Sequence, residues 1–271
     1  MAYSLEMTSR GYKFVPETPA DGLGFSPLYL DEPEWVGDRS SSSCNSCAKS
    51  FGFAKRRVCF SIILSFVHLC YAFQHHCRRC GQMFCNSCTP SSVPLRRMNF
   101  IDPVRQCKSC SDVSQHEVSF FQDKLKILSS GASFEGLLPN ANTPTQRGAR
   151  QLYAYFSDCN RFLVVEQKDV TGLGRKMEIR IKLDLINCAN FACICQMKGA
   201  HKVQMMNGVK LNYKTMDSDE AGELSMSPSR LYGSEMTEAA MDWLNAFYQA
   251  TKFVSEKNPG FLSISVTNDS S

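Results

Sequence analysis

Four cysteine pairs, each with two residues between its members, constrain this chain more than any other feature of its sequence. All four lie in one stretch, at Cys44/Cys47, Cys77/Cys80, Cys85/Cys88 and Cys107/Cys110. Each pair places two sulfurs on one tight turn, so two pairs complete the tetrahedral four-sulfur shell of a structural zinc ion. Such a shell has no open position for catalysis. We therefore expect two Zn²⁺ ions that build a scaffold, and a function that lies in what the scaffold presents.

The alternative for these cysteines is a set of disulfides. The first forty residues are polar and contain Pro and Gly, with no hydrophobic signal segment. We therefore expect a cytoplasmic protein in a reducing compartment, where disulfides are disfavoured and zinc is the better interpretation.

Charge is distributed unevenly along the chain. The segment from Lys49 to Lys108 carries ten Lys or Arg residues and one acid, Asp102, whereas the remainder carries 20 basic and 25 acidic residues. A basic zinc module joined to a mildly acidic domain can bind nucleic acid or an anionic membrane. The residues around the cysteines favour the membrane and argue against nucleic acid.

Hydrophobic periodicity divides the chain into five parts. Residues 1–33 show no periodicity and are predicted to be disordered, as are residues 257–271. Between them we predict a zinc finger over 34–114, a helical linker over 115–132 and a second domain over 133–256. That domain combines strands of period two with an amphipathic helix from Ser234 that bears Trp243. The predicted fold class is α+β, with a pleckstrin-homology-like antiparallel β-barrel and a C-terminal helix after the finger.

Several motifs resemble the FYVE zinc finger, a family that binds phosphatidylinositol 3-phosphate on endosomal membranes. They are the cysteine pairs, a Trp-x-x-Asp motif at Trp35 and Asp38, the run His-His-Cys-Arg-Arg-Cys-Gly at 75–81, and Arg-Gln-Cys at 105–107. The resemblance implies cross-bracing, with one zinc on Cys44, Cys47, Cys85 and Cys88 and the other on Cys77, Cys80, Cys107 and Cys110. Binding of each zinc contributes on the order of 10–16 kcal/mol, so the metal-free finger should be unfolded.

The same resemblance implies a lipid pocket. Its residues in this chain are Asp38, Arg56, Arg57, His75, His76, Arg78 and Arg105. Guanidinium groups bind phosphate oxygens through two parallel hydrogen bonds, and the carboxylate accepts hydrogen bonds from inositol hydroxyls. Arg79 occupies a position that the family pattern leaves free. Matching the family's membrane loop makes Phe53 and Ala54 the tip that enters the bilayer.

One departure from the family is a run of 17 residues, from Val58 to Gln74, that separates Arg57 from His75. Removing it restores a contiguous basic signature and leaves 12 of the 29 residues between Cys47 and Cys77. Valine codons begin with GT and Phe-Gln can be encoded as TTTCAG, so we hypothesise a translated, retained intron. A loop insertion, a buried helix and a membrane span stay open, although the run is shorter than the roughly 20 residues that span a bilayer.

Further segments resemble a branch of the FYVE family in which a pleckstrin-homology-like domain follows the finger. They include residues 93–98, 102–107 and 126–132. The resemblance implies a non-enzymatic adaptor, peripheral on endosomes, cytoplasmic vesicles and focal adhesions, with a role in adhesion disassembly and cell migration. The C-terminal domain then binds an unknown protein, for which the resemblance points to focal adhesion components.

Two other functions remain as alternatives. One is a protein-interaction scaffold whose finger does not bind lipid. The other is a RING-like ubiquitin ligase, but RING patterns use a histidine ligand between the pairs, whereas all eight ligands here can be cysteine. The sequence contains no P-loop, nucleophile elbow or His-Glu-x-x-His motif, so we predict no catalytic residues.

Overall fold

The computed structural model of the protein describes residues 3–8, 10–16, 25–51, 73–137, 150–167, 177–198, 201–216, 220–229, 234–256 and 260–266. The chain divides into two compact units. The N-terminal unit consists of Ala2–Glu17 and Tyr29–Ser119, and the C-terminal unit contains Thr18–Leu28 and Phe120–Ser271.

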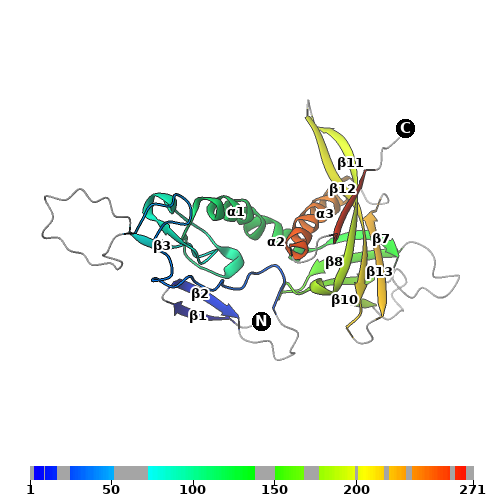
Figure 1. The fold of residues 1–271 in the computed structure, drawn as a ribbon. Coiled ribbons are helices and arrows are strands. Elements are labelled where there is room, and N and C mark those ends of the chain that lie inside the picture. Colours follow the sequence, from blue (N-terminus) through cyan, green and yellow to red (C-terminus); the bar gives the residue numbers. More distant parts are fainter. Residues whose placement is uncertain are drawn as a thin grey trace, which may run out of the picture. The chain divides into compact units, whose positions relative to one another are not determined.

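The N-terminal unit is built from short elements (Figure 1). They are the hairpins β1 (Tyr3–Thr8) with β2 (Gly11–Pro16), β3 (Gln74–His76) with β4 (Met83–Cys85) and β5 (Ser91–Val93) with β6 (Val104–Gln106), the 3-10 turns η1 (Asn86–Cys88) and η2 (Arg96–Met98), and helix α1 (Lys108–Ser119). One buried cluster of this unit consists of Cys44, Phe51, Cys77, Met83, Phe84, Cys85 and Cys107. Because cysteines make up more than half of that cluster, metal binding is needed to hold it together.

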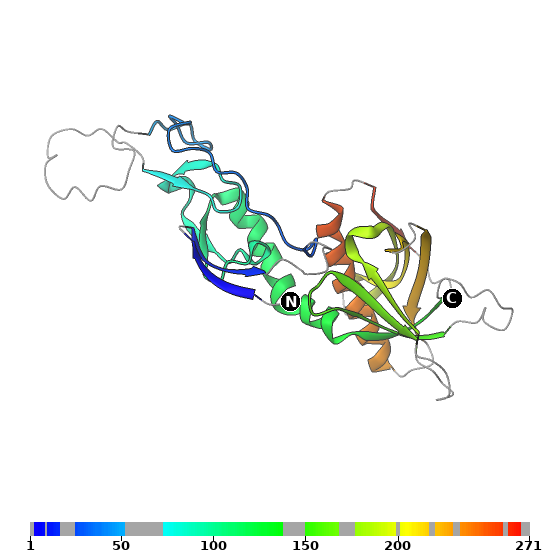
Figure 2. The ribbon, with the colours of Figure 1, turned by 90° about the horizontal axis from the view of Figure 1, so that it is seen from below.

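The hairpin β1–β2 corrects the prediction of disorder over 1–33. Strand β2 is held on its outer edge by residues 99–101: the Phe14 N–H donates to Asn99 O (3.0 Å), and the Ile101 N–H donates to Tyr12 O (3.1 Å). Figure 2 shows the hairpin, in dark blue, beside the rest of this unit. The segment from Tyr3 to Thr8 does alternate apolar and polar residues, but the bonds that order the hairpin come from residues far along the chain.

A run of helix links the predicted finger to the predicted second domain. Helix α1 begins at Lys108, earlier than the predicted linker at 115–132, and is followed by a π-helical turn η3 (Phe120–Lys124) and helix α2 (Leu125–Ser130). The border between the units falls before Phe120, which is buried in the core of the C-terminal unit. No helix in the described parts of the chain is both long enough and apolar enough to cross a bilayer.

The described part of the C-terminal unit contains an eight-stranded sheet in the order β10-β9-β8-β7-β13-β12-β11-β14. The strands are β7 (Ala132–Leu137), β8 (Arg150–Phe156), β9 (Phe162–Gln167), β10 (Glu178–Lys182), β11 (Ile186–Lys198), β12 (His201–Lys214), β13 (Ala221–Pro228) and β14 (Leu262–Val266). All neighbours are antiparallel except β11 and β14, which are parallel. Strand β14 falls within the predicted disordered tail 257–271 and corrects that prediction: it pairs with β11, and Phe261, just before it, is buried in the core.

Helix α3 (Ser234–Ser255) packs against this sheet and supplies its largest core side chain. Trp243 is fully buried, with its ring centroid 5.3 Å from that of Phe134 and 6.3 Å from that of Phe156. Its indole N–H donates to Leu128 O (3.2 Å), so the polar atom of a buried ring is satisfied. The predicted α+β class, with a mainly antiparallel sheet followed by a Trp-bearing helix, is confirmed; the described strands form a sheet with β10 and β14 at its two edges, and a closed pleckstrin-homology-like barrel stays a prediction.

Candidate functional site

The first thiol cluster joins two distant parts of the N-terminal unit. The sulfurs of Cys44, Cys47, Cys85 and Cys88 all lie within 4.8 Å of one another. Cys44 and Cys47 lie on a turn closed by the hydrogen bond from Ala48 N–H to Cys44 O (2.9 Å), while Cys85 ends β4 and Cys88 ends η1. The turn and the end of the hairpin thus bring four donors to one point.

The second thiol cluster consists of Cys77, Cys80, Cys107 and Cys110, whose sulfurs also lie within 4.8 Å of one another. The turn that carries Cys77 and Cys80 ends at Gly81, whose N–H donates to Cys77 O (2.9 Å). Gly81 has φ +70°, and a Cβ there would lie 2.5 Å from a backbone oxygen of a neighbouring segment. Glycine is therefore required at this position. Cys110 lies in the first turn of α1, which explains why that helix starts so early.

The cysteine pairs are interleaved as the family resemblance implied. In chain order, the first and third pairs form one cluster, and the second and fourth pairs form the other. Four sulfurs at one point match the donor set of a structural zinc site, so both clusters fit Zn²⁺. In the second cluster, hydrogen bonds from the thiols of Cys110 and Cys80 lower the pKa of Cys77, and the bond to Cys77 raises the pKa of Cys110. Without a cation the four groups cannot all ionise, whereas a dication stabilises all of them as thiolates.

Beside the second cluster, Trp35 and His76 lie among the residues that are predicted to form the lipid pocket. Their rings stack with centroids 4.6 Å apart and an angle of 24° between the planes. His76 Nε2 lies 2.7 Å from Val36 O and 3.9 Å from Asp38 Oδ1. Because a carbonyl oxygen can only accept, His76 Nε2 carries a hydrogen, and the imidazole is held in a defined orientation. Within the described residues, the buried indole N–H of Trp35 has no hydrogen-bond acceptor.

Two arginines extend this pocket. The guanidinium of Arg78 donates to His76 O (2.9 Å) and lies 5.4 Å from the ring centroid of Trp35. The backbone N–H of Arg78 donates to Arg105 O (3.0 Å), and the Arg105 guanidinium donates to Asn86 Oδ1 (2.8 Å). His75 precedes His76 on β3, and successive side chains of a strand lie on opposite faces. The structure thus brings the side chains of Asp38, His76 and Arg78 together. Arg105 lies next to them because its backbone carbonyl accepts the hydrogen bond from the Arg78 N–H.

Four predicted residues lie outside the described part of the chain. They are the lipid-binding candidates Arg56 and Arg57 and the membrane-insertion candidates Phe53 and Ala54. Most of the run from Val58 to Gln74 lies outside it as well. Gln74 itself begins β3, where it is paired with Cys85.

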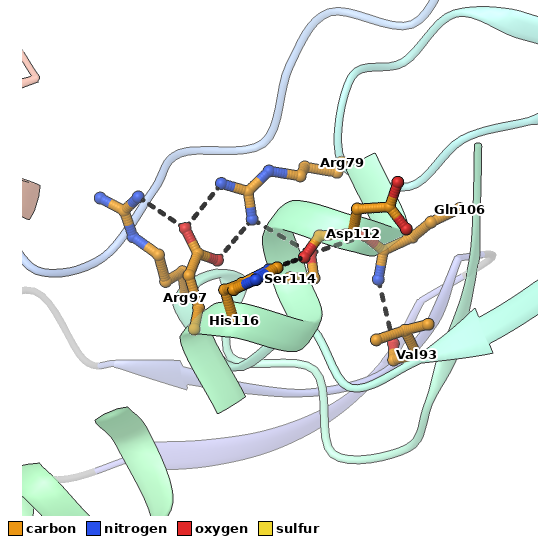
Figure 3. A network of polar contacts seen from close by, with 8 residues as sticks. Arg79, Val93, Arg97, Gln106, Asp112, Ser114 and His116 are labelled. Carbon is orange, nitrogen blue, oxygen red and sulfur yellow. Dashed lines mark hydrogen bonds and ion pairs between the residues drawn. The ribbon is translucent and has the colours of Figure 1, made fainter. Parts of the chain in front are cut away.

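Arg79, in contrast, belongs to a structural network (Figure 3). Its guanidinium donates twice to the carboxylate of Glu117, at 2.6 and 2.8 Å, and once to Ser114 Oγ at 3.1 Å. Arg97, which is 1% exposed, donates to the same carboxylate at 3.0 Å, and Ser114 Oγ donates to Gln106 Oε1 at 2.7 Å. Arg79 thus connects the second cysteine turn to α1 instead of facing a ligand.

Sequence reasoning missed one residue of the pocket, Arg10. It lies in the turn of the β1–β2 hairpin, with its guanidinium carbon 4.4 Å from the ring centroid of Trp35. Arg10 and Lys13 both form ion pairs with Glu32. Burial raises the pKa of Glu32, but hydrogen bonds from Lys13 and Arg10 outweigh it and hold that pKa below its usual value. No motif marks Arg10, because only the folded hairpin brings it to Trp35.

Two known sequence families match this chain. The FYVE zinc finger family matches residues 34–116, and the family described as "Zinc finger FYVE domain-containing protein 21 C-terminus" matches residues 119–259. The second match alone covers more than half of the chain. The border between the two matches agrees with the border between the units at Phe120.

Curated relatives share only part of their length with this chain. It is 29% identical over 131 residues to the probable inactive serine/threonine-protein kinase slob1 of Dictyostelium discoideum, an overlap of 46% of this chain and 19% of that protein. It is 27% identical over 103 residues to arrestin domain-containing protein A of the same organism, an overlap of 38% and 15%. The chain thus spans less than a fifth of the length of either relative.

Among solved structures, the tandem VHS and FYVE domains of Hrs are 30% identical over 31% of this chain and 30% of that chain, with a TM-score of 0.23. The hSac2 domain of the human phosphoinositide phosphatase Sac2 is 16% identical over 58% of this chain and 89% of that chain, with a TM-score of 0.31.

Proposed function

Because the chain belongs to the family of zinc finger FYVE domain-containing protein 21, we propose that it is a non-enzymatic adaptor that attaches to membranes. Its N-terminal unit binds phosphatidylinositol 3-phosphate as a peripheral protein of endosomes. Its C-terminal unit contacts a protein partner, for which focal adhesion components are the candidate class. In this proposal the adaptor acts in focal adhesion disassembly and cell migration.

The convergence of Asp38, His76 and Arg78 around Trp35 carries the proposal. Arg78 supplies N–H donors for a phosphate, and Asp38, 3.9 Å from the imidazole of His76, supplies an acceptor for inositol hydroxyls. The site lies directly beside the second thiol cluster, because Cys77 separates His76 from Arg78. Zinc binding at that cluster therefore positions the pocket without taking part in chemistry.

The composition of the metal clusters supports this function over a ubiquitin ligase. Each cluster in the described part of the chain contains four cysteines, whereas a RING finger uses a histidine ligand. One observation favours a scaffold with a lipid-inactive finger instead: the run from Val58 to Gln74 separates Arg56 and Arg57 from His75. An experiment must therefore test both the pocket and the run.

The pocket is tested by flotation of the zinc-loaded chain with vesicles that contain phosphatidylinositol 3-phosphate. The double variant His76→Ala/Arg78→Ala removes the imidazole that stacks on Trp35 and the charged donor Arg78, which alone is worth about 1.5–3 kcal/mol, so affinity should fall by tenfold or more. The matched control is Arg180→Ala, which removes an exposed arginine of the C-terminal unit. Zinc content must stay unchanged in both variants. Equal binding by the double variant and the parent contradicts the pocket, and retention of DNA in place of lipid supports a nucleic-acid module.

The run is tested by deleting Val58 to Gln74. In the deletion variant Arg57 directly precedes His75 and takes the place of Gln74 opposite Cys85. If the deletion variant alone binds, the run disrupts the pocket; if both chains bind, the run is a tolerated loop. If neither chain binds, the finger is a lipid-inactive scaffold.

A further inference from the structure

The hairpin β1–β2 exposes apolar side chains on its outward face. Leu5 is 60% exposed, Met7 75%, Tyr12 47% and Phe14 46%. Leu5 pairs with Phe14 and Met7 with Tyr12 across the two strands, so all four side chains lie on one face. Scattered apolar residues are ordinary on a protein surface, but four neighbouring ones form a patch of the kind that marks an interaction site.

The inward face of the same hairpin carries the polar side chains. Lys13 pairs with Glu6 across the strands, forms an ion pair with Glu32 and lies 5.0 Å from the ring centroid of the buried Phe100. A two-stranded ribbon on a protein surface ordinarily turns its apolar face inward. Here the polarity is inverted, and the ion pair to Glu32 maintains the inversion, because a slip of one residue would turn Lys13 outward.

The hairpin is continuous with the basic pocket. Its turn residue Arg10 lies over Trp35, which in turn stacks on His76. The pair Met7 and Tyr12 is the apolar pair nearest to that turn. The apolar pair Met7 and Tyr12 therefore lies at the end of the hairpin that adjoins Trp35 and His76.

The charge of the N-terminal unit indicates which kind of partner surface the outward face of the hairpin binds. The hairpin belongs to the unit that contains the strongly basic segment from Lys49 to Lys108, with ten basic residues and one acid. An anionic bilayer attracts such a unit, and aromatic and aliphatic side chains are suited to its interface. An anionic bilayer supplies both the negative charge and the apolar layer, so the combination favours a membrane.

We propose that the outward face of the hairpin, formed by Leu5, Met7, Tyr12 and Phe14, is a second membrane-contact surface, separate from the predicted loop tip. It enters the interfacial layer of an anionic bilayer while the pocket holds the headgroup, and in this respect it rests on the proposed function. The hairpin adds affinity for the bilayer, whereas the pocket selects the headgroup.

The test uses the full zinc-loaded chain and its Leu5→Gln/Met7→Gln variant, which changes outward side chains of an edge strand. The matched control is Ile264→Gln/Val266→Gln, since these residues are 47% and 52% exposed on edge strand β14 of the other unit. Binding is measured on phosphatidylcholine and phosphatidylserine vesicles with and without phosphatidylinositol 3-phosphate. Binding to soluble dibutanoyl phosphatidylinositol 3-phosphate reports the pocket alone.

We expect the hairpin variant to lose about tenfold or more in vesicle affinity, with soluble headgroup binding and the control variant unchanged. In a Tyr12→Trp variant, lipids brominated on their acyl chains should quench the additional fluorescence. Unchanged vesicle affinity or absence of quenching overturns the proposal. A parent dimer in sedimentation that the hairpin variant loses assigns the face to a second copy and also overturns it.

The same measurements separate this proposal from the proposed function. If the parent binds phosphatidylserine vesicles with no gain from phosphatidylinositol 3-phosphate, the pocket assignment fails, while quenching at Tyr12→Trp still supports the hairpin. A parent that binds no vesicle of either composition overturns both.

Discussion

The indole ring of Trp35 lies against the imidazole of His76, with 4.6 Å between the ring centroids. This stack joins the Trp-x-x-Asp motif to strand β3, two segments with 35 residues of sequence between them. It holds the imidazole where Nε2 reaches both Val36 O and the Asp38 carboxylate. The pocket therefore depends on Trp35 for its shape, although the indole carries no charge.

Replacing Trp35 with leucine should weaken headgroup binding by about tenfold, because stacking of this kind contributes about 0.5–1.5 kcal/mol beyond simple burial and also orients His76. Titration calorimetry with soluble dibutanoyl phosphatidylinositol 3-phosphate measures the loss. Zinc content should be unchanged, since Trp35 contributes no ligand. Full affinity in Trp35→Leu would show that the stack is dispensable.

Removing zinc should unfold the N-terminal unit and spare the C-terminal unit. The first depends on its thiol clusters for a core, whereas the second buries aromatic side chains around Trp243. The chain has two tryptophans, one in each unit, so the variants Trp243→Phe and Trp35→Phe each leave one reporter. A chelator should shift the emission of Trp35 to longer wavelength and leave that of Trp243 unchanged. A simultaneous shift of both would contradict independent folding.

Replacing Glu117 with alanine should destabilise the N-terminal unit by about 3 kcal/mol or more, because Arg97 is then left buried without its carboxylate. Urea unfolding followed through Trp35 in the Trp243→Phe background measures the change. The control is Glu6→Ala, which removes an exposed carboxylate of the same unit and should cost less than about 1 kcal/mol. Equal effects of the two substitutions would argue against a buried network.

Protonation of Glu32 at low pH should weaken its ion pairs with Arg10 and Lys13 and so loosen the β1–β2 hairpin from the rest of the unit. Because the folded state lowers the pKa of this carboxyl below its usual 4.5, its stabilising contribution is complete above that pH. The contribution is lost as the pH falls through the lowered folded pKa. The side-chain carboxyl resonance of Glu32 should therefore titrate below 4.5 in NMR spectra.

Glu32→Gln separates this effect from acid release of zinc. At neutral pH, where both clusters retain their metal, the variant should already show faster amide exchange at Phe14, whose N–H holds the hairpin to Asn99. Slow exchange at Phe14 in this variant would mean that the ion pairs contribute little to docking.

Much of the metal site could be predicted from the sequence, because ligand spacing within a Cys-x-x-Cys pair is a local property of the backbone. The amphipathic helix around Trp243 was predictable for the same reason, since its 3.6-residue period is local. The positions of Arg79 and Arg10 were not predictable. Two adjacent arginines look alike in sequence, yet Glu117 binds Arg79, whereas Arg78 lies beside Trp35.

The metal ligands and the motifs that flank them follow from the sequence alone, since thiol chemistry and short-range turns require no distant partner. The hairpin of Tyr3–Thr8 with Gly11–Pro16 and the strand Leu262–Val266 depend instead on the tertiary structure. The hairpin is held in place by a hydrogen bond to Asn99, and the strand Leu262–Val266 by pairing with β11; both partners are far away along the chain. A strand's backbone donors are satisfied by whichever segment the fold brings alongside, and that choice has no local signature.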